Sequence, residues 1–259
     1  MNKTFFQRCV RLAALGLLGC LFLAGSAFSA QEITVSGAAS LTNAFTEIKG
    51  LFEKKHPDIK VHTNFAASNP LLKQMEEGAP VDVFASADQE TMDKAAAKKL
   101  VDVSTRKDFA LNDLVMVVPS DSTLGLTGAK DLTKPEVKRI AVGNPDSVPA
   151  GRYTRDSLAS AGLWEKLQSK YIFGQSVRQV LDYVSRGEVD AGFVYGTDAK
   201  QAGDKVRVVM KMEGHEPVLY PVAVVSASSH KKLAQEFVDF ILSPAGRTVL
   251  EKYGFDEPR

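Results

Sequence analysis

Only two cysteines occur in this chain of 259 residues, and both, Cys9 and Cys20, lie within its first thirty residues. Without that segment no thiol remains for a disulfide, a nucleophile or a cysteine-bound metal. The four histidines lack the His-x-x-x-His and His-Glu-x-x-His spacings of zinc sites, so we expect them at the surface. Stability must therefore come from a hydrophobic core, and about 230 residues can bury a large one.

The sequence also lacks a hydrophobic run of the roughly 20 residues that a membrane-spanning helix needs. Lys3, Arg8 and Arg11 precede the apolar stretch LAALGLLGCLFLAG, and small residues follow it, which is the layout of a secretory signal peptide. We predict a signal peptide at 1–29, cleavage near residue 29 or 30, and export to the periplasm. The alternative is a lipid on Cys20, which is disfavoured because the hydrophobic run continues past this cysteine.

Neither sign of charge is in clear excess. The chain has 32 basic and 31 acidic residues, and the predicted signal peptide holds three of the basic ones, which leaves 29 against 31. This balance argues against nucleic acid or an anionic membrane surface as a partner.

Familiar catalytic and nucleotide motifs are missing as well. The stretch ITVSGAASLTNAF at 33–45 joins a strand to a helix through small neutral residues, with neither a Gly-x-Gly-x-x-Gly fingerprint nor a P-loop. Its Gly-Ala-Ala-Ser sequence, which ends at Ser40, is not the Gly-x-Ser-x-Gly elbow of serine hydrolases. An exported hydrolase is thus the weaker alternative to a binding protein.

Strand and helix patterns alternate through the first third of the folded chain. Apolar residues with helical spacing occupy 41–52, and proline at position 57 marks the end of that helix. The remaining predicted elements of this part are strands at 59–67 and 81–87 and helices at 68–78 and 88–100. Three successive strand–helix units predict a parallel sheet with right-handed crossovers.

Two longer apolar strands, at 113–120 and 220–228, bracket a second alternating set. This set comprises strands at 139–143, 171–174, 189–196 and 206–212 and helices at 153–167 and 177–187, and only helices follow the second long strand. We therefore predict an α/β protein with two lobes, 30–113 plus 221–259 and 114–220, between which the chain crosses twice. Ligands of open α/β sheets bind beyond the carboxyl ends of the strands, which places a ligand in the cleft between the lobes.

Four positions where predicted strands lead into helices face this cleft: Ser40 and Ser68 precede helices, Ala150 lies in the loop before the helix at 153–167, and Val177 opens a helix. Tyr195 ends a strand of the second lobe. Helix N-termini offer free N–H groups and partial positive charge, so several of them directed at one point form an anion site. The ordinary alternatives are that the serines simply cap helices and that Tyr195 is a core residue with a hydrogen-bonded hydroxyl.

The order and spacing of several motifs resemble periplasmic molybdate-binding proteins of ABC importers over essentially the whole mature chain. The motifs are ITVSGAASLTNAF, FAASNPLLKQMEEGAPVDVFASADQETMD, AVGNPDSVPAG, GFVYGTDA, YPVAVV and KYGF. The resemblance implies a type II periplasmic binding protein fold, in which each lobe is a mostly parallel sheet flanked by helices and two crossing strands form the hinge. It also implies molybdate or tungstate as ligand, no cofactor, a monomer, and delivery to a membrane permease with its ATPase.

By motif, the resemblance assigns the oxyanion ligands to the hydroxyls of Ser40, Ser68 and Tyr195 and to the backbone N–H groups of Ala150 and Val177. One departure is that the family often has a run of serines after the position of Phe65, whereas this chain reads Ala-Ala-Ser-Asn-Pro at 66–70. A proline at position 70 donates no amide. The Val177 assignment depends on its distance from Tyr195, since the residues around it have little motif character.

Neutral donors of this kind suit a small tetrahedral dianion, and closure of the lobes around it is expected. Sulfate or another tetrahedral oxyanion remains the main alternative ligand. A carrier of metal cations would need clustered carboxylate or histidine ligands. An amino-acid carrier would pair an arginine and an aspartate with the ligand's two charges, and Arg152 and Asp198 lie near the predicted site.

Overall fold

The computed structural model describes residues 31–258. The predicted signal peptide, its cleavage site and both cysteines lie outside the described residues. Between residues 31 and 258, none of the helices has both the length and the hydrophobicity to cross a membrane.

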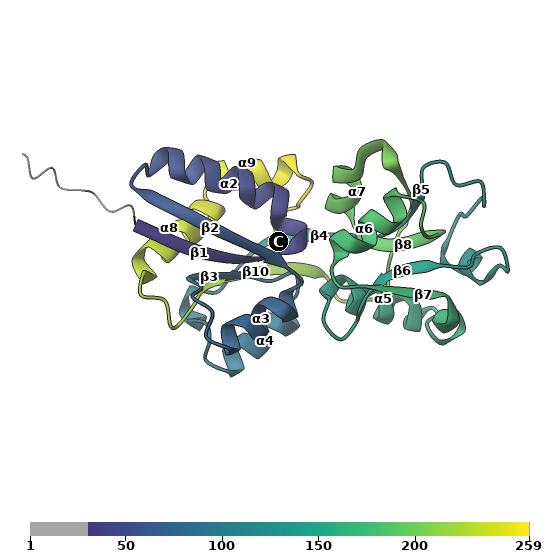
Figure 1. The fold of residues 1–259 in the computed structure, drawn as a ribbon, viewed down its shortest axis with the longest axis horizontal. Coiled ribbons are helices and arrows are strands. Elements are labelled where there is room, and N and C mark those ends of the chain that lie inside the picture. The colour runs from purple at the N-terminus through teal and green to yellow at the C-terminus, as the bar shows by residue number, and fades with distance from the viewer. Residues whose placement is uncertain (1–30, 259) are drawn as a thin grey trace, which may run out of the picture. The chain divides into compact units, whose positions relative to one another are not determined.

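Two five-stranded sheets organise the chain (Figure 1). The strands are β1 (Gln31–Ala38), β2 (Ile59–Ala66), β3 (Val83–Ala85), β4 (Lys107–Asn112), β5 (Leu114–Pro119), β6 (Ile140–Gly143), β7 (Tyr171–Gly174), β8 (Ala191–Tyr195), β9 (Val206–Lys211) and β10 (Val218–Val224). The helices are α2 (Thr42–Lys55), α3 (Ser68–Glu76), α4 (Gln89–Ala97), α5 (Pro149–Ser160), α6 (Val177–Ser185), α7 (Gly196–Ala202), α8 (Lys231–Leu242) and α9 (Pro244–Lys252).

The two sheets share one plan. The first has the strand order β2-β1-β3-β10-β4 and the second β7-β6-β8-β5-β9. β1 pairs in parallel with β3, and β6 pairs in parallel with β7 and β8, while β10 and β5 each run antiparallel to both neighbours. The prediction of an α/β fold with two lobes and mostly parallel sheets is confirmed.

In the first lobe, helices cover both faces of the sheet, with α2, α8 and α9 on one face and α3 and α4 on the other (Figure 1). In the short strand β3, alternate side chains pack against the helices on opposite faces of the sheet. Val83 and Ala85 pack into the cluster that holds Phe45 and Phe237, whereas Phe84 packs into the cluster that holds Met92. Because successive side chains of a strand point to opposite faces, a strand covered on both sides is apolar throughout, as this one is.

The second lobe is built in the same way, with α5 on one face of its sheet and α6 and α7 on the other (Figure 1). All five residues of β8 are buried, which explains the unbroken apolar run Ala-Gly-Phe-Val-Tyr. This strand carries Tyr195 at its carboxyl end.

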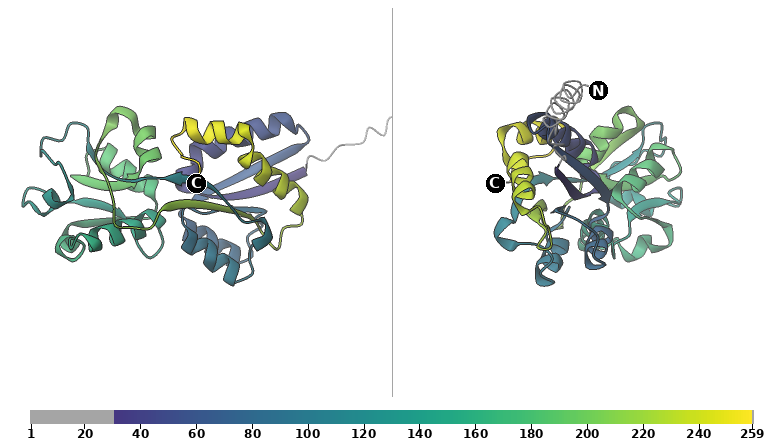
Figure 2. Two further views of the ribbon diagram at one scale, coloured as in Figure 1. Left: turned by 180° about the vertical axis from the view of Figure 1, so that it is seen from behind. Right: turned by 60° about the vertical axis from the view of Figure 1, so that its left-hand side comes forward.

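The chain passes between the sheets at two adjacent places. β4 leads into β5 through the single residue Asp113, and β9 leads into β10 through residues 212–217. The two passages run side by side, because Asn112 is the pairing partner of Val218 and the Met212 N–H donates to the Leu114 carbonyl at 2.8 Å (Figure 2). All of β10 belongs to the first sheet, so the predicted lobe boundary between 220 and 221 falls inside this strand. β4 is an additional strand that the sequence patterns did not indicate.

Candidate functional site

All five predicted ligand residues line one small cavity between the lobes. The centre of a water-sized sphere can occupy about 10 Å³ of it. The residues around it are small or apolar apart from two serines and a tyrosine: Ala38, Ala39, Ser40, Ala67, Ser68, Ala87, Val148, Pro149, Ala150, Val177 and Tyr195. The structure therefore brings the predicted set together, and its role in binding an anion stays a prediction.

Ser40 and Ser68 reach the cavity from the first lobe. Ser40 lies in a single 3-10 turn, 39–41, between β1 and α2, and Ser68 is the first residue of α3. Neither hydroxyl caps a helix, so the ordinary reading of a serine before a helix is wrong at both positions. Pro70 is the third residue of α3.

Each serine oxygen already has a neighbour in the protein. The Ser68 Oγ accepts a hydrogen bond from the Ala87 N–H at 3.0 Å, and the Ser40 Oγ lies 2.9 Å from the Tyr220 Oη. Both serines are at most 2 % exposed. A hydroxyl whose oxygen is accepting keeps its own proton to donate, and for Ser68 that proton is free for the cavity.

Ala150 is the second residue of α5, after Pro149 at the first helical position, so the prediction that it lies in a loop before a helix starting at 153 is wrong. Proline has no N–H to lose there, and the next amide has no acceptor within the helix. A Cβ added to Gly151 would lie 2.0 Å from the Gly143 carbonyl oxygen, so only glycine lets this helix start sit directly on the end of β6. The close approach positions Ala150 at the cavity.

Val177 is the first residue of α6. The preceding Ser176 caps this helix, because its Oγ accepts from the Gln179 N–H at 3.2 Å, and the cap leaves the Val177 amide without an intrahelical acceptor. The N-termini of α2, α3, α5 and α6 thus meet at one cavity, with the 3-10 turn of Ser40 leading into α2, and their dipoles favour negative charge there.

Tyr195 is 1 % exposed, and its hydroxyl has no hydrogen-bond partner among residues 31–258. Buried hydroxyls are nearly always paired, so such a group inside a cavity calls for a partner. Burial raises the pKa of the Tyr195 phenol well above its usual value, which keeps the group a neutral donor. Tyr195 does lie in the core, but the expectation of a satisfied hydroxyl is wrong within residues 31–258.

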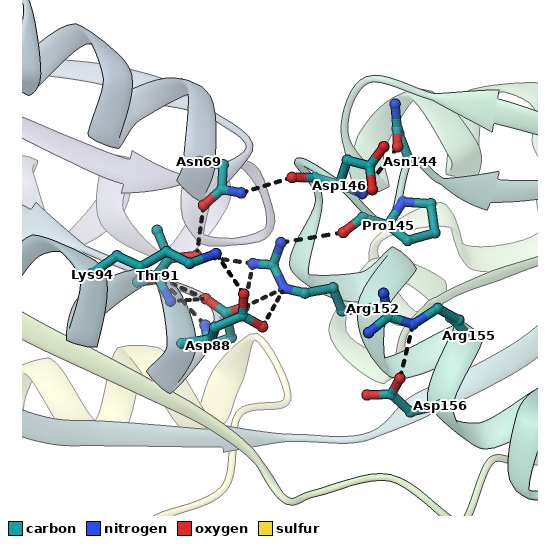
Figure 3. Close-up of polar contacts among 12 residues, drawn as sticks. Asn69, Asp88, Thr91, Lys94, Asn144, Pro145, Asp146, Arg152, Arg155 and Asp156 are labelled. Carbon is teal, nitrogen blue, oxygen red and sulfur yellow. Dashed lines mark hydrogen bonds and ion pairs between the residues drawn. The ribbon is translucent and has the colours of Figure 1, made fainter.

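A buried ion pair joins the lobes beside the cavity (Figure 3). Arg152 of α5 donates through Nε to the Asp88 Oδ2 at 3.0 Å and through Nη2 to the same oxygen. The same guanidinium donates to the Thr91 Oγ1 at 2.9 Å and lies 3.3 Å from the Glu90 carboxylate. Asp88 also caps α4 by accepting from the Thr91 N–H at 3.2 Å.

Arg178 is a second arginine that contacts both lobes. Its Nε lies 2.6 Å from the Asp198 Oδ1, without the alignment of a hydrogen bond, and its Nη2 donates to the Ser40 carbonyl at 3.3 Å. Burial raises the pKa of the Asp198 carboxyl to about 6, against the opposing effect of Arg178. Arg152 and Asp198 are therefore each paired with a protein charge, and this pairing removes the support for an amino-acid carrier.

The sequence departure at 66–70 also has a structural role. The Asn69 Nδ2 donates to the Asp146 carbonyl of the second lobe at 2.9 Å, and its Oδ1 accepts from the Thr91 hydroxyl at 3.1 Å (Figure 3). Sequence reasoning did not identify Asp88, Arg178 or Tyr220 as neighbours of the site. The one available signal was the position of Arg178 directly after the predicted ligand Val177.

No metal centre competes for this role within the described chain. Across residues 31–258, no three histidine, aspartate or glutamate side chains come together as metal ligands. None of the residues that line the cavity carries a charge.

Comparisons with known proteins agree in kind. A family model described as "Bacterial extracellular solute-binding protein" matches residues 33–256. A Bacillus subtilis protein provisionally named as the ABC transporter substrate-binding lipoprotein YvgL is 39% identical over 94% of this chain and 94% of its own length. The molybdate-binding protein ModA of Escherichia coli is 38% identical over 90% of this chain and 92% of its own length.

Among solved structures, one from Clostridium difficile, provisionally described as the substrate-binding domain of a molybdenum ABC transporter, is similar in sequence and fold. It is 40% identical, with a TM-score of 0.68, and the match covers 88% of this chain and 99% of that one.

Proposed function

Because the chain belongs to the family of bacterial extracellular solute-binding proteins, we propose that it captures molybdate between its lobes for an ABC importer. Tungstate, with the same charge and shape, is the expected second ligand. In this proposal the mature protein acts as a periplasmic monomer and delivers the anion to a membrane permease, whose ATPase drives import.

The observation that carries the proposal is the Tyr195 hydroxyl. It is buried in a cavity without charged lining, it has no partner among the described residues, and it stays protonated. Ser40, Ser68, Ala150 and Val177 line the same cavity, so their hydroxyls and backbone amides are the further donors of the proposal. Each charge-assisted hydrogen bond to an anion contributes about 1.5–3 kcal/mol, so five together can replace much of a small dianion's hydration.

The chemistry of the lining favours a fully deprotonated ligand. No carboxylate lines the cavity, and the two serine oxygens have neighbours of their own at 2.9 and 3.0 Å. A hydrogen phosphate ion would bring a proton that finds no acceptor, and an unpaired buried donor costs about 1–3 kcal/mol. Molybdate, tungstate and sulfate carry no such proton at neutral pH, so cavity size must choose among them.

Binding rather than catalysis fits the same lining. Ser40 and Ser68 have no histidine or carboxylate beside their hydroxyls in the cavity, so neither has the general base that an active serine needs. The other lining side chains, apart from Tyr195, have no group that can transfer a proton.

Calorimetry of the purified protein against molybdate, tungstate, sulfate and phosphate tests the proposed ligand. We expect binding of molybdate and tungstate in the micromolar range or tighter, and no heat from phosphate. Tight binding of sulfate with no response to molybdate would replace the proposed ligand by the main alternative.

Tyr195→Phe tests the proposed site. Because its hydroxyl has no partner among residues 31–258, its loss should leave the melting temperature of the ligand-free protein unchanged or slightly raised. The variant should bind molybdate roughly ten- to a hundredfold more weakly, through loss of one charge-assisted bond. Ser40→Ala and Ser68→Ala should weaken binding to a similar degree, and wild-type affinity in all three variants would remove the site.

A further inference from the structure

A buried hydrogen-bond network connects Ser40 to the passages between the lobes. It consists of Ser40, Tyr220 of β10, Asn112 at the end of β4, and Thr197 of α7. Each of these residues is at most 6 % exposed. Tyr220 and Asn112 lie outside the cavity lining, so neither would touch an anion held there.

The orientation of the Asn112 amide follows from its backbone neighbours. Its Oδ1 accepts from the Asp113 N–H at 2.9 Å and faces the Thr197 N–H at 3.4 Å. Backbone N–H groups only donate, so the atom they face must be the amide oxygen. The Nδ2 group then donates to the Thr197 Oγ1 at 2.9 Å and to the Tyr220 Oη at 3.3 Å.

This orientation sets the direction of the next bond. The Tyr220 oxygen accepts from Asn112, so its own proton is available for the Ser40 Oγ at 2.9 Å. Burial raises the pKa of the Tyr220 phenol well above its usual value, which keeps that proton in place. With its oxygen accepting from Tyr220, the Ser40 hydroxyl has its proton left to donate, and Ser40 lines the cavity in which an anion would accept it.

We propose that Tyr220 is a positioning residue for anion binding, which orients the Ser40 hydroxyl so that its proton points into the cavity. The inference builds on the proposed function and adds to it a residue that does not touch the ligand. Without the Tyr220 hydroxyl, the Ser40 hydroxyl can rotate and donate its proton elsewhere. Each binding event must then turn it back toward the anion, which weakens binding. The expected loss is smaller than that of removing the Ser40 hydroxyl itself.

Tyr220→Phe removes the phenol hydroxyl and keeps the ring, which packs against Phe109 and Phe255. Asn112 retains Thr197 as a partner, so the variant should remain folded. We expect its calorimetric dissociation constant for molybdate to rise about tenfold, equivalent to one neutral hydrogen bond. Tyr171→Phe is the matched control, because it loses one tyrosine bond, to the Trp164 carbonyl at 3.0 Å, outside the cavity lining, and should bind as wild type.

A double-mutant cycle with Ser40→Ala separates positioning from a general structural effect. If Tyr220 acts through Ser40, adding Tyr220→Phe to Ser40→Ala should cause no further loss of affinity. Losses that add in the double variant, or a Tyr220→Phe protein with wild-type affinity, would overturn the inference while the proposed function stands. A wild-type protein that binds none of the tetrahedral oxyanions would overturn the proposed function and this inference together.

Discussion

Asp88 holds the counter-charge for Arg152 across the lobe interface, and Asp88→Asn is the sharpest perturbation of closure that the structure offers. The two side chains are 4 % and 7 % exposed, which makes theirs the most buried ion pair within residues 31–258. The substitution keeps the size of the side chain and its position before α4. It removes the charge that Arg152 faces when the lobes are together.

The size of the effect can be worked out from the contacts. Removing one partner of a buried pair costs about 3–5 kcal/mol, because the other charge stays buried. Arg152 keeps the Thr91 hydroxyl at 2.9 Å and the Glu90 carboxylate at 3.3 Å, so the lower end, about 3 kcal/mol, applies. If the lobes separate in the open form, water reaches Arg152 there, and the cost falls on the closed form alone.

A ligand that needs the closed form loses affinity in proportion to the lost population of that form. About 3 kcal/mol corresponds to roughly a hundredfold, which sets the upper limit, and we expect the dissociation constant for molybdate to rise ten- to a hundredfold. Calorimetry measures this change directly. Combining Asp88→Asn with Arg152→Met should recover part of the affinity, because no buried charge is then left without a partner.

Lys98→Met is the control, since it breaks an exposed pair with Glu76, 2.6 Å apart, within the first lobe. Exposed pairs contribute about 0–1 kcal/mol, so this variant should bind as wild type. If Asp88→Asn also binds as wild type, the buried pair does not stabilise the form that holds the anion, and the link between closure and affinity is refuted.

Three further changes test the surroundings of the site. Gly151→Ala places a Cβ 2.0 Å from the Gly143 carbonyl oxygen and should lower the free energy of unfolding by about 1–3 kcal/mol. Gly50→Ala is the control, because open space surrounds this position, and it should be neutral or stabilising. Equal melting temperatures of the two variants would contradict the close packing of α5 on β6. Val177→Pro removes the proposed amide donor and should weaken molybdate binding about tenfold. The cost in stability should be small, because Ser176 already has the extended backbone, φ −156° and ψ 163°, that a following proline prefers. Unchanged calorimetric affinity would show that this amide is not a ligand. Asp198 has its pKa raised from 3.8 to about 6, so its protonation stabilises the folded state below pH 4, and this contribution is lost as the pH rises through 6. The advantage of wild type over Asp198→Asn in urea unfolding should therefore shrink by on the order of 2 kcal/mol between pH 4 and pH 7, and a constant difference would refute the raised pKa.

The sequence by itself determined most helices and strands of this protein, β4 and α7 excepted, and the positions of its candidate ligands along the chain. Apolar periodicity located most of the strands and helices, and α6 begins at Val177 as predicted, whereas α5 begins at Pro149, four residues before its predicted start. These signals are local, so they can be read without knowledge of the fold. The motif resemblance assigned ligand roles to five residues, all of which line the cavity.

Only the tertiary structure decided what the side chains do. Ser40 and Ser68 look like caps in sequence, yet their hydroxyls turn to Tyr220 and Ala87, which are far away in the chain. Arg152 could have served a ligand carboxylate, but the fold places Asp88, 64 residues earlier, against it. A side chain's partner depends on which strand ends and helix starts meet across the two lobes. A local sequence pattern does not encode such contacts between residues far apart in the chain.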